Sequence, residues 1–381
     1  MTFTANWSFP TLIRFGLGRI SELGEACQSV GMENPLLVTD RGLAPLSITS
    51  EALDLMEASG FNRALFAEVD PNPNELNLAG GLKAYKDGNH DGIIAFGGGS
   101  GIDLAKMIAF MCGQTRPVWD FEDIGDWWTR ADSCAIAPII AVPTTAGTGT
   151  EVGRASVLTN SETHQKKIIF HPKVMPSLVI SDPALTVGMP PVITAGTGMD
   201  AFAHCLEAYC SPHFHPMAQG IALEGMRLVK NNLHRAFVDG KDIEARTQML
   251  VAATMGATAF MKGLGAIHAL SHPIGGHYNT HHGTTNAVVM QPVLRFNEAA
   301  IADRLSDASA YLGLGGGFNA FYDYVGELNR SLNMPENLTS LGVTDPDMDA
   351  LVADALIDPS VGGNPIEMTQ ENTRALFESC F

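Results

Sequence analysis

The sequence predicts an α/β domain built on a parallel sheet, followed by an all-α domain. In the first half, short apolar runs alternate with helical patterns, as in sheets whose parallel strands are joined by crossover helices. After Asp182-Pro183, helical patterns predominate. A chain of 381 residues also exceeds the size at which one core usually keeps growing. We therefore expect two domains, 1–183 and 184–381, with no flexible linker between them.

Strands of the first domain are expected where apolar runs end in polar residues or glycine. PLLVTDRG is a buried run that ends in Asp40, and LVISDP has the pattern of a last strand. The other expected strands lie near Pro10 and at 64–69, 93–96 and 135–142, and the intervening helices begin near Ile20 and cover 50–59, 76–87 and 102–111.

Helices of the second domain follow from apolar residues at helical spacing. They are expected at 191–211, 215–237, 243–260, 265–272, 283–295, 299–308, 319–332, 348–356 and 370–381.

Composition and charge argue against several classes of partner. The chain has 23 basic and 41 acidic residues, so its net charge of −18 disfavours nucleic-acid backbones and anionic membranes. Its six cysteines are scattered without a CxxC pair, as in a reduced cytoplasmic protein. The N-terminal MTFTANWSFPTLIRFG lacks a basic region followed by an apolar run, and no stretch approaches 18 apolar residues. We expect a cytoplasmic protein without a signal peptide or transmembrane helix.

The segment DGIIAFGGGSGIDLAKMIAFM contains a candidate phosphate-binding loop. It predicts a strand at 93–96, a tight turn at 97–100, and a helix at 102–111 with Asp103 in its first turn. Glycines and the free N–H groups of a helix start can hold a phosphate or pyrophosphate. The spacing departs from G-x-G-x-x-G, because Ile102 occupies the third glycine position. A plain βα turn is the alternative.

A second loop, PTTAGTGT at 143–150, follows the apolar run at 135–142. Glycines let the backbone approach a ligand, and hydroxyls can bond to it. Both loops are expected at the carboxyl edge of the sheet, where α/β proteins bind ligands.

Histidines concentrate in 263–286, GLGAIHALSHPIGGHYNTHHGTTN, which holds five of the 12 in the chain. His268 and His272 are four residues apart, and so are Asp200 and His204 in a separate helical stretch; such pairs share one helix face. One carboxylate with up to three imidazoles is a reasonable set for Fe, Zn, Ni or Cu. Spacing alone does not choose among the histidines, and a chance cluster on a solvated loop is the alternative.

Several further motifs occur in one collinear order: PTLIRFG, GGGSGIDLAK, PTTAGTGTEVG, DPALT, TGMDAFAHCLEAYCS, GAIHALSHPIGGHYNTHHGTTNA and GNP. With them the chain resembles the iron-containing, or group III, alcohol dehydrogenase family from about residue 9 to 377. The resemblance implies a Rossmann-like dinucleotide-binding domain, an all-α metal domain, and a cleft between them for NAD(P) and a divalent ion. This is the dehydroquinate synthase-like, iron-dependent alcohol dehydrogenase fold.

The family takes its metal ligands from D-A-x-x-H and H-x3-H-P-x8-H-G motifs. Carried over to this chain, the ligands are Asp200, His204, His268 and His282. His272 matches a family histidine that lies near the nicotinamide without binding metal. His277 and His281 match no family ligand, and we expect them to be structural or at the pocket edge.

The resemblance also implies the cofactor site. Carried over, its residues are Gly97, Gly98, Gly99, Ser100, Asp103, Thr144, Thr145, Thr148 and Leu185. Asp40 matches the position where NAD-preferring members place an acid. A carboxylate there accepts ribose hydroxyls and repels a 2′-phosphate, which favours NAD over NADP.

We therefore expect hydride transfer between NAD(H) and an alcohol/aldehyde pair, with Fe2+ as the ion and Zn2+ or another divalent ion as a substitute. His272 is the candidate proton relay. A homodimer with a small-molecule substrate is expected, without nucleic-acid or membrane partners.

Two cations suggest an acid-bearing substrate, such as a semialdehyde or its hydroxy acid. Lys262 precedes the histidine stretch, in a segment one residue shorter than in many family members, and Arg154 follows the second loop. The alternative is that both pair with Asp or Glu.

Other classes of function stay open from the sequence. A glycerol dehydrogenase-like or dehydroquinate synthase-like enzyme shares the superfamily, and a non-catalytic metal- and NAD-binding protein is a further alternative.

Overall fold

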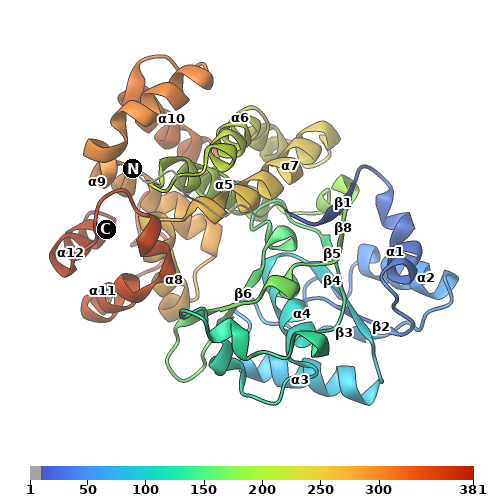
Figure 1. The fold of residues 1–381 in the computed structure, drawn as a ribbon. Helices are drawn as coiled ribbons and strands as arrows, with labels where there is room; N and C mark the ends of the chain where they lie inside the picture. Colours follow the sequence, from blue (N-terminus) through green and yellow to red (C-terminus); the bar gives the residue numbers. More distant parts are fainter. Residues whose placement is uncertain (1–9) are drawn as a thin grey trace. The chain divides into compact units, whose positions relative to one another are not determined.

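The computed structural model describes residues 10–381, which form two compact units (Figure 1). The first, the α/β unit, contains residues 10–145 together with Gly149–Gly188. The second, the helical unit, contains Ala146–Thr148 and Met189–Phe381. The first nine residues, on which the expectation of no signal peptide partly depends, lie outside the described part of the chain.

The α/β unit is built on a parallel sheet, which in the described chain has six strands in the order β1-β8-β5-β4-β2-β3. Every residue of β2, β4, β5 and β8 is buried, as expected for strands covered on both faces. In this order, the strands are β1 (Leu12–Phe15), β8 (Leu178–Ser181), β5 (Ile139–Pro143), β4 (Gly92–Gly97), β2 (Pro35–Val38) and β3 (Leu65–Phe66).

Helices pack against this sheet through apolar side chains. Leu23 and Met56, from α1 and α2, join Phe96 and Ile140 of the sheet in one buried cluster. Helix α4 contacts β4 and α3, and its residues from Gly101 onward are buried. The helices are α1 (Leu23–Ser29), α2 (Ser47–Ala58), α3 (Glu75–Asp87) and α4 (Gly99–Met111), and the short 3-10 helices used below are η5 (Thr150–Val152) and η7 (Pro183–Thr186).

An antiparallel hairpin of β6 (Ala155–Thr159) and β7 (Lys166–Phe170) was not expected from the sequence. It is tied to α4 by two buried charges. Asp103 accepts a hydrogen bond from the Val157 backbone N–H at 3.0 Å. The Lys106 ammonium donates to the carbonyl of Ala155, the first residue of β6, at 2.5 Å. The hairpin therefore depends on side-chain bonds to α4 as well as on its own ladder.

The helical unit is arranged around α5, which contacts α6, α7 and α9. Most of α5 is buried, including the whole stretch from Gly198 to Cys210. Its Ala, Met, Phe and Leu side chains form the core expected of a helix enclosed by other helices. The helices are α5 (Pro191–Cys210), α6 (Pro216–Val238), α7 (Ile243–Ala259), α8 (Ala266–Tyr278), α9 (His282–Tyr311), α10 (Gly317–Ser331), α11 (Met348–Ile357) and α12 (Gln370–Glu378), with 3-10 helices η8 (Phe260–Lys262) and η9 (Pro359–Gly363).

Three helices differ from expectation. Helix α8 continues through Pro273. Helix α9, which contains Pro292, continues across 296–298, where a break between two helices was expected. Each proline removes one main-chain hydrogen bond, and burial of the surrounding residues offsets that loss. Helix α4 begins at Gly99, so the glycine turn is shorter than expected.

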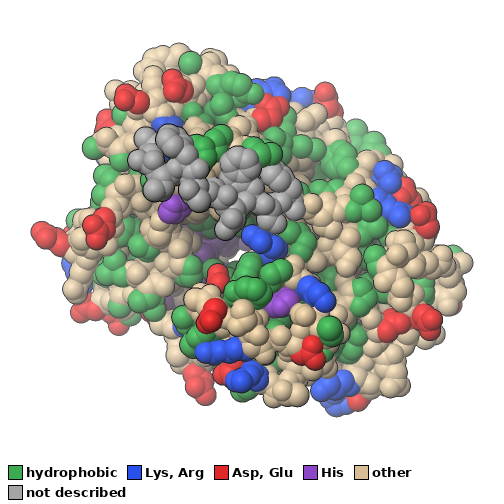
Figure 2. Space-filling view, viewed as in Figure 1, with side chains coloured by type: hydrophobic (Ala, Val, Ile, Leu, Met, Phe, Trp, Pro, Cys, Tyr) green, Lys and Arg blue, Asp and Glu red, His purple; other side chains and the backbone are tan. Residues whose placement is uncertain are grey.

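The surface shown in Figure 2 carries acidic and basic side chains in small interspersed groups. No single helix in residues 10–381 is long and apolar enough to span a membrane; 243–262 and 266–278 meet that test together but are bent by 108°.

Candidate active site

Helix α5 presents three polar side chains on one face. Asp200, His204 and Glu207 are separated by four and three residues, so they lie on successive turns of the same side. All three are buried, at 4%, 4% and 6% exposure, inside an otherwise apolar helix. Buried polar groups are costly unless they have partners, so this face must meet other polar groups.

Helices α8 and α9 supply those partners. His268 and His272 are one turn apart on α8, and His282 and Asn286 are one turn apart on α9. Between the helices, Asn279 ends α8 in a left-handed conformation, and the His281 side chain caps α9 by accepting from the Thr284 N–H.

Close approach of α5 and α9 requires glycine. A Cβ at Gly283 would overlap the main-chain carbonyl of Gly196 and would lie 3.1 Å from the Asp200 Cβ. Because Gly283 adjoins His282, the contact between these two backbones sets how far His282 lies from Asp200.

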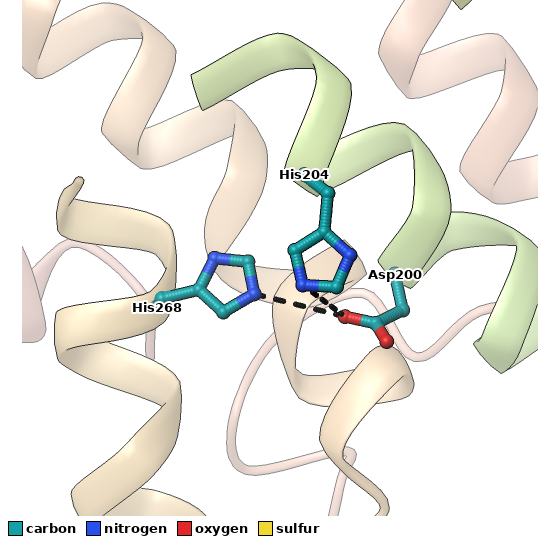
Figure 3. Close-up of side chains that lie close together, drawn as sticks. All are labelled: Asp200, His204 and His268. Carbon is teal, nitrogen blue, oxygen red and sulfur yellow. Dashed lines mark ion pairs between the residues drawn. The ribbon is translucent and has the colours of Figure 1, made fainter. Parts of the chain in front are cut away.

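One carboxylate oxygen is the meeting point of three imidazoles. Asp200 Oδ1 lies 3.7 Å from Nε2 of His204, 3.7 Å from Nε2 of His268, and 3.4 Å from Nε2 of His282. Figure 3 shows the first two rings directed at the carboxylate. A tetrahedral ion with bonds of about 2.1 Å holds its donors about 3.4 Å apart. The ligand atoms of Asp200, His204 and His268 all lie within 4.8 Å of one another, so these three residues fit one divalent ion, and His282 lies beside the same carboxylate oxygen.

The environment prepares these groups for binding a cation. Burial alone would raise the pKa of Asp200, but its electrostatic interactions with His204 and His282 and hydrogen bonds from His268 and His282 hold that pKa well below its usual value. Burial lowers the pKa of His204 to about 4, which keeps this imidazole neutral near pH 7. Burial opposes protonation of His268 as well, but the Glu207 charge and the bond to Asp200 raise its pKa to about 9. The carboxylates of Glu207 and Asp200 therefore favour a positive charge at this position.

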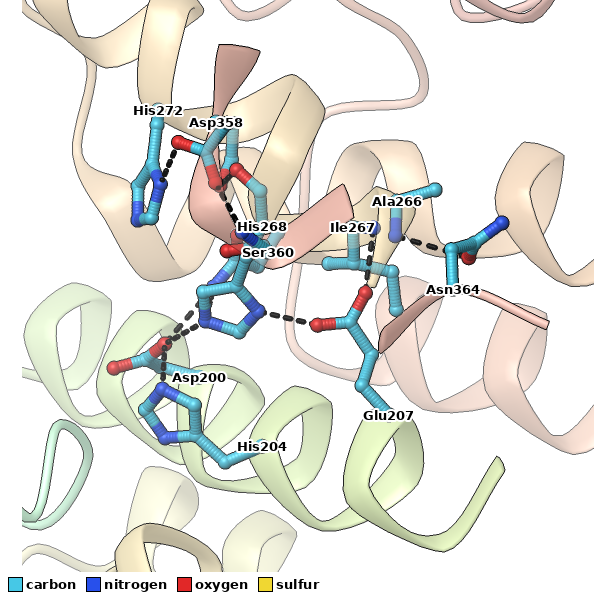
Figure 4. A network of polar contacts seen from close by, with 12 residues as sticks. Asp200, His204, Glu207, Ala266, Ile267, His268, His272, Asp358, Ser360 and Asn364 are labelled. Atoms are coloured by element: carbon cyan, nitrogen blue, oxygen red, sulfur yellow. Dashed lines mark hydrogen bonds and ion pairs between the residues drawn. The ribbon is translucent and has the colours of Figure 1, made fainter. Parts of the chain in front are cut away.

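Two carboxylates behind the histidines were not predicted from the sequence (Figure 4). Glu207 Oε2 lies 2.5 Å from Nδ1 of His268, and Asp358 Oδ2 lies 2.7 Å from Nδ1 of His272. Burial would raise the pKa of Asp358, but His272 and Ser360 lower it overall. Such outer carboxylates orient imidazole rings at metal centres.

Asn286 is a third residue that sequence reasoning missed. Its buried amide donates to Asp200 Oδ1 at 2.9 Å and lies 3.2 Å from Nε2 of His282. The available signal was its position four residues after His282, the same spacing that links Asp200 to His204.

The remaining histidines of the stretch have other contacts. The His272 ring stacks on His282 at 5.4 Å between centroids, beside the ligand set. His277 pairs with Asp354 at 2.8 Å and is partly exposed, while His281 caps α9.

Lys262 is not positioned to bind an acidic substrate. It is 2% exposed, and its ammonium donates to the Tyr209 carbonyl at the end of α5, at 3.0 Å. Arg304 donates to the same carbonyl and to those of Cys210 and Ser211. Burial and the Arg304 charge lower the Lys262 pKa to about 8. Neither sequence interpretation anticipated a main-chain acceptor, because the unpaired carbonyls of a helix end attract cations without any acidic residue nearby.

In the α/β unit, the predicted cofactor residues Asp40, Gly97 and Thr144 lie together. Asp40 and Thr144 follow β2 and β5, and Gly97 is the last residue of β4, which lies between these two parallel strands. Gly97 has φ 153°, a conformation that favours glycine, and a Cβ there would lie 3.8 Å from Asp40 Oδ2. A Cβ at Gly98 would lie 3.1 Å from Thr145.

This edge of the sheet offers polar groups to a ligand. Helix α4 begins at Gly99, and no side chain caps its start. The buried hydroxyls of Thr39 and Thr144 have no hydrogen-bond partner among residues 10–381. Free helix N–H groups and unpaired hydroxyls suit a nucleotide phosphate and ribose.

Other residues assigned to the cofactor already have protein contacts. Asp103 accepts from the Thr150 hydroxyl at 2.5 Å and from the Val157 N–H. The Ser100 hydroxyl donates to the Pro71 carbonyl at 2.5 Å. Leu185, in η7, is part of the apolar core, and Thr148 belongs to the helical unit. Their contacts with a cofactor stay predictions.

Comparisons with known proteins cover nearly the whole chain. The model of iron-containing alcohol dehydrogenase matches residues 10–183, and the C-terminal model of the same family matches 194–381. A 4-hydroxybutyrate dehydrogenase from Cupriavidus necator is 39% identical, over 97% of each chain.

Solved structures agree. A 1,3-propanediol oxidoreductase has a TM-score of 0.93 and 33% identity, over 99% of each chain. A sulfoacetaldehyde reductase from Bifidobacterium kashiwanohense, in complex with NAD+, has a TM-score of 0.89 and 27% identity, over 100% of this chain and 99% of that one. The predicted fold class and the resemblance drawn from the motifs are confirmed. The chain belongs to the iron-containing alcohol dehydrogenase family.

Proposed function

We propose that this protein is an NAD-dependent dehydrogenase that interconverts an acid-bearing alcohol and its aldehyde, with Fe2+ bound by Asp200, His204, His268 and His282. Family membership makes the chain an oxidoreductase that acts on alcohols. The identity of the ion, the cofactor and the substrate class is what we propose beyond family membership. Zn2+ is the substitute ion that the same four donors would accept.

One observation supports the metal requirement most strongly. Three imidazole nitrogens surround one buried carboxylate oxygen at 3.4–3.7 Å. When bound, a divalent ion supplies Lewis-acid chemistry at the alcohol oxygen, and NAD+ accepts the hydride. The protein contributes an ionised carboxylate that offsets part of the cation charge and a fixed set of ring orientations.

His272 is the proposed proton relay, and Asp358 orients it. The bond between Asp358 Oδ2 and Nδ1 of His272 places the ring N–H on Nδ1. Nε2 is then the atom that can take up or release a proton.

NAD is the proposed cofactor because Asp40 lies beside the glycine loop. Its Oδ1 accepts from the Gly42 and Leu43 N–H groups at 2.8 and 2.9 Å, which fixes the carboxylate near Gly97. A fixed negative charge there disfavours the 2′-phosphate of NADP. The solved relative in complex with NAD+ supports this choice.

Arg154 is the proposed binding residue for the substrate carboxylate. No carboxylate among residues 10–381 forms an ion pair with it, and its guanidinium lies 5.4 Å from the centre of the Phe170 ring. An arginine without an acidic partner can hold a carboxylate through two parallel bonds. The 4-hydroxybutyrate dehydrogenase relative supports an acid-bearing substrate. Lys262 does not suit this role, because its ammonium is buried and donates to a carbonyl at the end of α5.

We further propose that the enzyme is a cytoplasmic homodimer. Six free cysteines suit a reducing compartment. Light scattering on the purified protein tests the oligomeric state.

Reconstitution tests the proposed function. Protein purified without oxygen is stripped of metal, and activity with 4-hydroxybutyrate is measured after adding Fe2+ or Zn2+, with NAD+ or NADP+. We expect activity only with added ion and a preference for NAD+. Full activity of the stripped protein, or a preference for NADP+, would contradict the proposal.

Substitution of Arg154 tests the substrate class. In Arg154→Met, KM for 4-hydroxybutyrate should rise about tenfold or more, because a charged hydrogen bond is lost, while KM for 1,4-butanediol should change less than about twofold. Arg63→Met is the matched control, because Arg63 already pairs with Asp54 and Glu57. Equal effects on both substrates would show that Arg154 does not bind the carboxylate.

A further inference from the structure

We propose that Glu207 is a positioning residue that sets the ring tautomer of His268 and the start of α8 with one carboxylate. The inference rests on the proposed function only in assuming that the donor set binds a divalent ion.

Both oxygens of Glu207 have a donor on α8. Oε2 lies 2.5 Å from Nδ1 of His268, and Oε1 accepts from the Ile267 N–H at 2.6 Å (Figure 4). The side chain is 6% exposed, so solvent does not compete for these bonds. A single buried carboxylate thus joins α5 to the first turn of α8.

The first bond decides which ring nitrogen of His268 carries the hydrogen. A neutral imidazole has one N–H, and a carboxylate at Nδ1 draws it to that side. Nε2, which is directed at Asp200 Oδ1, is left with its lone pair toward the position of the ion. Without Glu207, the Asp200 carboxylate beside Nε2 would draw the hydrogen to the nitrogen that has to be free for the ion.

The second bond satisfies an N–H group that the helix itself leaves unpaired. The first four N–H groups of a helix have no partner inside it. The N-cap residue of α8 is Gly265, which has no side chain that could accept a hydrogen bond from them. Two side chains from distant parts of the sequence act as caps instead: Asn364 accepts from the Ala266 N–H at 3.1 Å, and Glu207 accepts from the Ile267 N–H. A negative charge at a helix start is favourable in itself.

Asn364 offers a control within the same helix start. It is held by a reciprocal amide pair with Asn297, at 2.9 and 3.0 Å, and no hydrogen bond joins it to His268 in the described structure. Loss of Asn364 therefore disturbs the cap alone, whereas loss of Glu207 disturbs the cap and the ring. A cavity of about 20 Å³ borders Glu207, Asn297 and Asn364, so an isosteric change at Glu207 is preferable to truncation.

Glu207→Gln is the diagnostic variant. The site presents two donors, the His268 Nδ1–H and the Ile267 N–H, and a carboxamide has only one acceptor oxygen. Its NH2 group must face one donor, so one contact becomes repulsive. We expect the Kd for Co2+, measured by titration with the metal alone, to rise about 10- to 100-fold. Asn364→Ala should lower Tm and change this Kd less than about threefold.

A spectroscopic signal separates a tautomer effect from a purely structural one. In the Co2+-loaded wild type, the His268 Nδ1–H should give an exchangeable, paramagnetically shifted proton resonance. Glu207→Gln should lose or move that resonance, and Asn364→Ala should keep it. If Glu207→Gln does not fold, Glu207→Asp, which keeps the charge and shortens the reach, should still bind Co2+ more weakly than wild type and move the resonance.

The outcomes distinguish the two proposals. Wild-type affinity and an unmoved resonance in the Glu207 variants would overturn the inference, as would equal loss of affinity in Glu207→Gln and Asn364→Ala. If the wild type binds no divalent ion, the proposed function fails first. Activity on alcohols enters neither measurement.

Discussion

Asp200 and His282 show how the centre is assembled from single residues. The i, i+4 spacing in the sequence indicates which side chains share a helix face, and the structure brings Asp200, His204 and His268 to within ligand distances of one another. His282 approaches the same oxygen from α9. Glu207 and Asp358 were not predictable, because the histidine that each contacts is far away in the sequence and neither residue has a motif of its own. Asn286 was missed although its spacing of four residues from His282 was an available signal.

The assignment of His282 as a metal ligand, and of His277 as a residue that does not bind the ion, can be tested directly. His282→Ala should raise the Kd for Co2+ by more than about 100-fold, beyond the effect typical of an outer residue, and should abolish activity. His277→Ala, on the same stretch, loses only a partly exposed pair with Asp354 and should stay within about twofold of wild type. A comparable loss in both variants would place His277 at the ion.

Secondary-structure elements were predictable where their pattern is long or strongly apolar. Buried strands β2, β4 and β5 and helices α5 to α7 follow from apolar runs and helical periodicity. The β6–β7 hairpin was missed because β7 contains Lys166 and Lys167 and because its anchor, Asp103, looked like a ligand residue. The extent of α8 was missed because a proline ends an isolated helix, whereas tertiary burial can carry a helix through it.

The anchor between α4 and the hairpin has a consequence for stability at alkaline pH. Burial lowers the pKa of Lys106 to about 8, below the value of about 10.4 expected in the unfolded chain. Between these values the unfolded state binds more protons, so stability rises with pH, by up to about 3 kcal/mol for a shift of this size.

Lys106→Met should remove this contribution. The difference in unfolding free energy between the wild type and Lys106→Met should therefore grow in favour of the wild type from about pH 8 to about pH 10. Urea denaturation across this window checks the sign. A constant difference would mean that Lys106 titrates in the folded protein as it does in the unfolded chain.

At the scale of the whole molecule, the two units hold different parts of the chemistry. All four predicted ligands belong to the helical unit, whereas Asp40 and the glycine loop belong to the α/β unit. The change of pattern after Asp182-Pro183 predicts two domains, 1–183 and 184–381. It does not predict that Ala146–Thr148 group with the helical unit, because that depends on contacts with residues distant in sequence.

Removal of the divalent ion by a chelator should therefore destabilise the helical unit and not the α/β unit. Binding at about 100 times Kd stabilises a folded state by about 2.7 kcal/mol. Removal of the ion should speed hydrogen exchange in α5, α8 and α9, with little change in β2, β4 and β5, whereas NAD+ should slow exchange after those strands. Equal changes in both units on chelation would contradict the assignment of the ion to the helical unit alone.

The contact between Gly283 and Gly196 has a consequence for transplanting the centre. The backbones of α9 and α5 touch there, one residue from His282 and four from Asp200. A protein that received only the four donors on more widely spaced helices would hold them too far apart for one ion. A transplanted centre would thus need both closely packed helices together with their ligands. Gly196 and Gly283 are as necessary to it as the histidines.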